Sequence, residues 1–290
     1  MVLESIVSDV IARRHPSTIF FMALILSSVS IWVSFYVFPN SSSILPLAFV
    51  TIGFVPIIHK MFVEETMEEV EKPGWAPAFI TRHFELVLLY AFLFLGLIAS
   101  YTLWYVVLPS AETNCIGAEK ALNCGFPTRE KIFSEQENVF SKITGRAVGA
   151  NECKNPATKS IEKCTFFIFS NNSFVLVLAI MFSFLFGAGA IFLIGWNASV
   201  IGTFIGKEVV EVHALAGLLR GISYLPHGMW EITGYFMGAI AGGIISAVLS
   251  GKTYGSHQFE TIAKDTLSMI IIAYILLFIG AAIEAWLIVG

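Results

Sequence analysis

Charged residues are scarce in this sequence. Only 13% of its 290 residues are Asp, Glu, Lys or Arg, whereas a soluble domain has about 25%. Hydrophobic residues make up 56%, and the mean hydropathy is +0.78. This composition excludes a soluble enzyme and a nucleic-acid-binding protein, so we expect no nucleic acid among the partners.

The sequence also lacks the alternation of apolar and polar residues that marks a transmembrane β-barrel. The segment 86–108 has 23 consecutive residues without a charge, and about 20 apolar residues suffice for one helix to cross the bilayer core. Helices are then the remaining way to span a membrane. The sequence therefore predicts an all-α, polytopic transmembrane helix bundle, in contact with the lipid bilayer.

We predict about six spans, at residues 18–38, 44–63, 86–108, 174–205, 226–249 and 266–289. The fourth comes from 165–206, 42 residues without a charge, which is roughly twice what one straight helix needs. We place 165–173 at the outer interface and expect a bend near Gly187 and Gly189. The polar segment 207–225 predicts a cytoplasmic interfacial or re-entrant helix. Because six spans leave Lys252 and Lys264 outside, a seven-span version in which 207–225 crosses stays open.

Cysteine is absent from the chain except in one stretch. Residues 109–169 contain all four cysteines together with eight Lys or Arg and seven Asp or Glu. Disulfides persist on the oxidising side of a membrane, so this stretch predicts an extracytoplasmic loop subdomain. It separates an N-terminal three-helix transmembrane region, 1–108, from a C-terminal transmembrane core, 170–290.

Four cysteines allow three pairings. Pairing Cys115 with Cys124 and Cys153 with Cys164 closes the shortest loops, each worth about 2.7 kcal/mol in the chain-entropy model. We favour this pairing, and the other two stay open.

Basic residues predict the orientation. Arg13, Arg14, Lys60, Lys72 and Arg82 all lie at span ends on one side, whereas the connector 39–43 has no Lys or Arg. The positive-inside rule then predicts a multi-pass protein of the cell membrane with a cytoplasmic N-terminus and the 109–169 loop outside. With six spans, the C-terminus is cytoplasmic as well.

Ionisable residues inside the spans are few, and the densest group begins the fifth span. His227 and Glu231 share a helical stripe with small residues, and a charge within a span is a functional-site hypothesis by default. They form either a structural pair at i, i+4 spacing or, with Asn197, a functional polar focus. Arg220 and Glu284 are secondary candidates.

Two stripes of small residues predict close helix packing. The members are Gly195, Ser199, Gly202 and Gly206 in the fourth span and Gly234, Gly238 and Gly242 in the fifth. They could pack these two spans against each other, with His227 and Glu231 facing Gly195 and Gly202 or the segment around Arg220. They could also form a homodimer.

A catalytic zinc site needs about three protein ligands, whereas His227 and Glu231 supply two. The His-Glu-x-x-His pattern of zinc proteases is missing. We therefore assign no catalytic residue, no metal site and no cofactor.

Several motifs occur together in the C-terminal half: Asn171-Asn172, Gly187-Ala188-Gly189, the GWNASVIG segment at 195–202 and the LPHGMWE segment at 225–231. Together they resemble the stage II sporulation protein M family of polytopic membrane proteins, over about 170–290. The first three spans resemble those of archaeal members, but the 109–169 loop is longer than expected. The resemblance implies a membrane scaffold, which in sporulating bacteria works with a cell-wall hydrolase pair, and it places Asn197, His227 and Glu231 in the family motif.

Three functions remain. The leading hypothesis is a non-enzymatic scaffold or assembly protein that anchors a membrane or extracytoplasmic partner. The alternative is a small-solute or ion transporter or channel with a polar path at Asn197, His227 and Glu231. The third is an intramembrane metal-dependent hydrolase, so enzymatic activity is not favoured but stays open.

Overall fold

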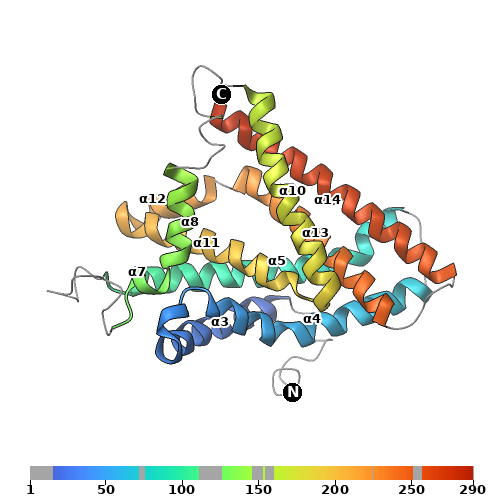
Figure 1. Cartoon of the computed structure of the whole chain (residues 1–290), viewed down its shortest axis with the longest axis horizontal. Coiled ribbons are helices and arrows are strands. Elements are labelled where there is room, and N and C mark those ends of the chain that lie inside the picture. The colour runs from blue at the N-terminus through green and yellow to red at the C-terminus, as the bar shows by residue number, and fades with distance from the viewer. Residues whose placement is uncertain are drawn as a thin grey trace.

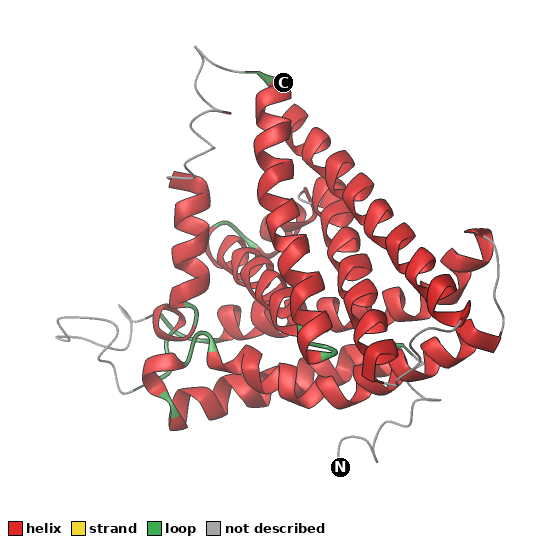
Figure 2. Cartoon of the chain, turned by 45° about the vertical axis from the view of Figure 1, so that its right-hand side comes forward, coloured by secondary structure: helices red, strands yellow, loops and turns green. Residues whose placement is uncertain are grey.

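The computed structural model describes residues 16–71, 76–110, 126–145, 153, 160–223, 225–250 and 257–289. Within these ranges every regular element is a helix (Figure 2). The all-α prediction is therefore confirmed.

Seven of the helices are long and apolar enough to cross a membrane. They are α3 (Ser17–Val37), α4 (Leu45–Glu71), α5 (Ala76–Val107), α10 (Ile161–Phe186), α11 (Ala190–Glu211), α13 (Leu225–Ser250) and α14 (His257–Val289). Shorter helices lie between them: η1 (Pro39–Ser41), α7 (Arg129–Ile132), α8 (Ser134–Gly145) and α12 (Ala214–Ser223). The chain is a multi-pass helical bundle, as the hydropathy predicts.

The long helices form two groups (Figure 1). In one group α5 packs against α3 and α11, and α4 lies beside α3. In the other, α13 packs against both α10 and α14. One core cluster of buried apolar side chains runs through both groups, with Phe54, Leu93 and Ile240 fully buried in it.

The predicted fourth span is two helices. α10 ends at Phe186 and α11 begins at Ala190, and Gly187 between them has a φ of +70°, a conformation that glycine adopts without steric cost. A Cβ on Gly187 would also lie 2.9 Å from Nδ1 of His59. The segment 165–173, which we expected at the interface, belongs to α10.

Seven crossings change the expected sidedness. With six spans both termini lie on the same side, whereas seven put the C-terminus on the side opposite the N-terminus. The start of α14, including Lys264, then falls on the N-terminal side. This removes the conflict of Lys264 with the positive-inside rule, while the orientation of the N-terminus itself stays a prediction.

The predicted interfacial segment contains the end of α11 and all of α12. The 10 residues of α12 are too few to cross a membrane, since about 20 are needed. α12 folds back on α11, where Gly217 faces the backbone of Val209 and Gly221 faces Ile205. With seven crossings, parity puts α12 on the side of the 109–169 loop, whereas the six-span scheme put it on the side of the N-terminus.

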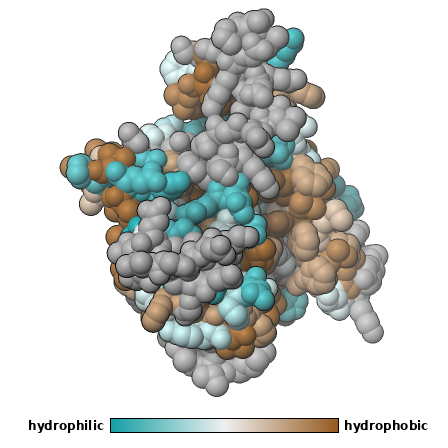
Figure 3. Space-filling model, turned by 60° about the vertical axis from the view of Figure 1, so that its left-hand side comes forward, coloured by the Kyte–Doolittle hydropathy of each residue, from teal (hydrophilic) through white to brown (hydrophobic). Residues whose placement is uncertain are grey.

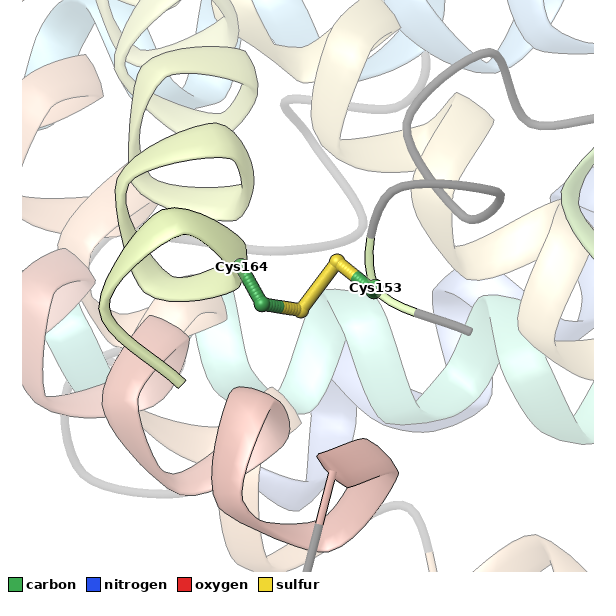
Figure 4. Close-up of a disulfide and its surroundings, with 2 residues drawn as sticks. All are labelled: Cys153 and Cys164. Atoms are coloured by element: carbon green, nitrogen blue, oxygen red, sulfur yellow. A yellow bond between two sulfur atoms is a disulfide. The ribbon is translucent and has the colours of Figure 1, made fainter. Parts of the chain in front are cut away.

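Part of the cysteine-containing loop is described. Cys153 and Cys164 form a disulfide that joins this loop to the first turn of α10 (Figure 4). Cys115 and Cys124 lie outside the described residues, so their pairing stays a prediction.

The end of the molecule with α7, α8 and α12 faces the viewer in Figure 3, where hydrophilic side chains gather at the centre and hydrophobic ones flank them.

Candidate functional site

Glu231 lies in the second turn of α13, on the face that packs against α10 and α14. The helix begins at Leu225, with Pro226 in its first turn, where the missing N–H of proline costs no hydrogen bond. Local sequence thus fixes where α13 starts, and with it the position of Glu231 along the helix.

Gly280 of α14 allows the two helices to approach closely at Glu231. A Cβ on Gly280 would lie 2.7 Å from Cγ of Glu231, 3.2 Å from the carbonyl oxygen of His227 and 3.4 Å from Oε1 of Glu231. Any larger residue at 280 would displace the Glu231 side chain. The carboxyl of Glu231 therefore faces protein on its α14 side and not acyl chains.

A second carboxyl group lies nearby. Glu284 follows Gly280 by one helical turn, which places both on the same face of α14. Glu231 interacts electrostatically with Glu284, and Tyr235 interacts with both carboxyl groups. The structure thus brings the secondary candidate Glu284 to the predicted focus.

Asn172 of α10 completes this cluster. Its side chain faces Glu231 and is only 7% exposed. We call Asn172, His227, Glu231, Tyr235 and Glu284 the polar cluster.

A family model supports the sequence resemblance. The model for stage II sporulation protein M matches residues 17–287. The chain belongs to this family. No curated protein and no solved structure matches the chain, so family membership comes from this match.

The match extends through the whole described core of this stage II sporulation protein M family member, from α3 to α14. It therefore includes the first three spans and the 109–169 segment, whereas the resemblance read from the motifs covered about 170–290.

Asn197 does not join the polar cluster in this family member. It lies on α11 and its Nδ2 donates a hydrogen bond to the carbonyl oxygen of Leu193, 2.9 Å away on the same helix. No described contact links it to Glu231. Arg220 lies on α12, and its side chain is outside the described residues.

The glycine stripe of α11 packs against α5. Gly202 faces Ile98 and Tyr101, and Gly206 faces Tyr105. A Cβ added at either glycine would be in close contact with these residues. The hydroxyl of Thr102 also donates to the carbonyl oxygen of Gly202 at 3.0 Å. Gly195 faces Leu47 and Leu97. The expectation that Glu231 faces Gly195 and Gly202 is therefore wrong, because these glycines face other helices.

The glycine stripe of α13 packs against α14 and α10. Gly234 lies against Ala273 and Leu277 of α14, while Gly238 and Gly242 lie against Leu176, Ile180 and Ser183 of α10. Ser199 of the other stripe accepts a hydrogen bond from Nε2 of Gln136 at 3.3 Å. These contacts are all within one chain.

Sequence reasoning missed Asn172, Tyr235 and Gly280 as members of this neighbourhood. The spacing of Gly280 and Glu284 is a usable signal, because a small residue one turn from an acid marks a face that another helix approaches. Asn172 gives no such signal, since its partner lies on another helix. Among the described residues, no group of three or more His, Cys, Asp or Glu is placed to hold a metal ion.

Proposed function

We propose that this protein is a non-enzymatic membrane scaffold that anchors an extracytoplasmic or membrane protein partner through its outer helices, α7 and α8. The observation that carries the proposal is the attachment of α8 to the transmembrane helices by Gln136, whose side chain is fully buried. A scaffold must hold its docking surface in a fixed relation to the membrane, and this contact does so.

Gln136 makes hydrogen bonds to two separate parts of the bundle. Its Nε2 donates to the carbonyl oxygen of Ser43 at 3.0 Å, and its Oε1 accepts from the Ser43 hydroxyl at 2.7 Å. The same Nε2 reaches Ser199 of α11. A buried amide satisfied in this way is costly to remove, since its loss leaves the partner groups unpaired.

Tyr105, at the outer end of α5, provides a second attachment. Its hydroxyl donates to Oε1 of Glu137 at 2.7 Å, and its carbonyl oxygen accepts from Nε of Arg129 at 2.7 Å. The guanidinium of Arg129 also lies 5.7 Å from the centre of the Tyr105 ring, within the range of a cation–π contact. Both α7 and α8 are thus held against the spans, which supports a rigid outer surface.

Photo-crosslinking in native membranes tests the proposal. A photoreactive side chain at exposed Asn138 of α8 should give one discrete protein adduct, and the same group at Ile275, an exposed apolar position of α14, should not. An adduct of twice the chain mass would identify a second copy as the partner. Failure of Asn138 and of neighbouring Glu135 to crosslink any protein would contradict the scaffold.

The polar cluster favours a second candidate, a transporter or channel, because ionisable residues inside spans often line substrate or ion paths. Against this, Glu231 packs tightly on Gly280, which supports a sealed helix contact. Purified protein in liposomes decides between the two. Solute or ion flux that depends on Glu231 would favour the transporter, and absence of flux together with the Asn138 adduct would favour the scaffold.

A further inference from the structure

The two groups of long helices contact each other toward the end of the bundle that lies opposite α7, α8 and α12. There, Phe236 of α13 stacks on Tyr90 with the two ring centroids 5.8 Å apart, and Tyr90 lies in the first half of the α5 span, His83–Val107. Phe62 lies in the last turn of the α4 span and faces Gly243 of α13. These contacts join the two groups at the end where α4 ends and α14 begins, which we call the narrow end.

At the other end the two groups diverge. In Figure 1 the ends of α10 and α14 near the C-terminus lie well apart from the ends of α3 and α5 near α7, and the view in Figure 2 shows the same divergence. At the narrow end, by contrast, α13 packs against α4 as well as α14. In Figure 1, α8 and α12 lie in the angle between the groups. We call this the broad end, and the molecule is a wedge.

α12 adds a further helix to the broad end. Gly217 faces Val209 of α11, and Gly221, one turn later in α12, faces Ile205, one turn earlier in α11. α12 therefore runs antiparallel to α11 and folds back beside its last turns. Three leucines on α12 are exposed, Leu215, Leu218 and Leu219. Because α11 covers the glycine face, these leucines point away from the bundle.

The apolar surface of α12 continues onto the spanning helices beside it, which face lipid. Val210 at the end of α11 and Met229 at the start of α13 are exposed as well. Trp230 and Trp286 are also exposed, at the broad ends of α13 and α14, and tryptophan is enriched at the membrane–water interface. A short helix with an apolar exposed face inserts between the headgroups and the acyl chains. α12 thus occupies area in the leaflet at the broad end only.

We propose that this protein partitions into membrane that is convex on the side of its broad end. A wedge displaces more lipid in the leaflet at its broad end than in the other leaflet. A membrane curved in this direction supplies the additional area, whereas a flat bilayer must deform around the protein at a cost. The partner is a curved lipid surface of no particular headgroup charge, because α12 contains a single ionisable residue, Arg220.

Narrow membrane tethers pulled from giant vesicles test the proposal with the full-length protein. A fluorophore on Glu135→Cys, at an exposed position of α8, marks the broad end. A membrane-impermeant quencher then distinguishes molecules whose broad end faces outward from those whose broad end faces the lumen. Relative to a lipid dye, the outward-facing molecules should be enriched several-fold in the tether, because its outer surface is convex. The molecules with the opposite orientation should be depleted.

Two triple variants locate the source of this sorting. Trimming the exposed leucines of α12 should lower the enrichment, because it narrows the broad end; the changes are Leu215→Ala, Leu218→Ala and Leu219→Ala. The matched control trims three exposed apolar residues at the narrow end and should not lower it. Its changes are Leu185→Ala in α10 with Leu267→Ala and Ile271→Ala in α14.

Equal distribution of the two orientations of the wild-type protein between tether and vesicle would overturn the proposal, and this comparison needs no variant to fold. Enrichment of the molecules whose broad end faces the lumen would overturn it as well. So would the same enrichment in both triple variants, because sorting would then not depend on α12. None of these results bears on the crosslinking at Asn138, so the wedge and the scaffold fail separately.

Discussion

Gly280 sets the distance between α13 and α14 at the polar cluster. Its missing side chain leaves room for Cγ of Glu231 and the carbonyl oxygen of His227. Glycine in a helix interior costs about 0.5–1 kcal/mol relative to alanine, so its presence here fits a position where the backbone of another helix approaches. The chain offers a matched control in Gly228, where a Cβ would meet nothing within 4 Å.

Gly280→Ala should therefore destabilise the protein by roughly 1–3 kcal/mol, because overpacking forces Glu231 to move. Gly228→Ala should leave stability unchanged or raise it by about 0.5–1 kcal/mol through better helix propensity. Thermal unfolding of both variants in the same detergent measures the difference. Equal unfolding temperatures would show that α13 and α14 do not approach at this point.

At the scale of elements, α12 differs from the spanning helices in both length and surroundings. One face packs on α11 through Gly217 and Gly221, and three leucines are exposed on it, Leu215, Leu218 and Leu219. A short helix with an apolar exposed face lies in the membrane interface with that face toward lipid. These features predict that α12 is an interfacial helix beside α11.

A nitroxide probe at Leu218 should therefore be relaxed strongly by oxygen, because oxygen concentrates in lipid. A water-soluble paramagnetic reagent should relax the same probe only weakly. A probe at Glu211, a solvent-exposed end of α11, should show the reverse. Electron paramagnetic resonance in nanodiscs makes the comparison. Aqueous accessibility at Leu218 equal to that at Glu211 would place α12 in water.

At the scale of the whole molecule, the break at Gly187 decides the topology. It makes seven candidate spans and moves the α13–α14 connection to the N-terminal side. Glu135 of α8 and Glu260 of α14 are both exposed, and they lie on opposite sides only if seven helices cross. The six-span scheme puts both outside.

Thiol labelling from outside should consequently reach a cysteine at Glu135 and not one at Glu260. Opening the vesicles should make the second position reactive, which shows that the thiol is intact. Labelling of both positions in sealed vesicles would restore six spans, and labelling of Glu260 alone would reverse the orientation.

Hydropathy predicted most of this fold, but not the break in the charge-free run. The run 165–206 is long enough for two crossings, yet nothing polar separates them, and only the positive φ of Gly187 reveals where one helix ends. Sequence identified Gly187 as a bend because glycine disrupts helices. It could not tell a bend from a reversal, which depends on where α11 finds its packing partner, α5.

The candidate site, like the fold, was predicted only in part from the sequence. Helical periodicity placed His227 and Glu231 on a small-residue face, because that argument needs one helix only. The convergence of Asn172 and Glu284 on Glu231 depends on how α10, α13 and α14 pack, which the spacing within a single helix does not encode. The position of Asn197 was misjudged for the same reason.

The most direct test of the scaffold compares the yield of the Asn138 crosslink between two variants. In Gln136→Ala, α8 loses its buried attachment to Ser43 and Ser199, so the adduct should fall several-fold while the protein stays in the membrane. In Glu231→Gln, the outer helices are untouched and the adduct should persist. An adduct that survives Gln136→Ala but disappears in Glu231→Gln would contradict the account and place function in the polar cluster.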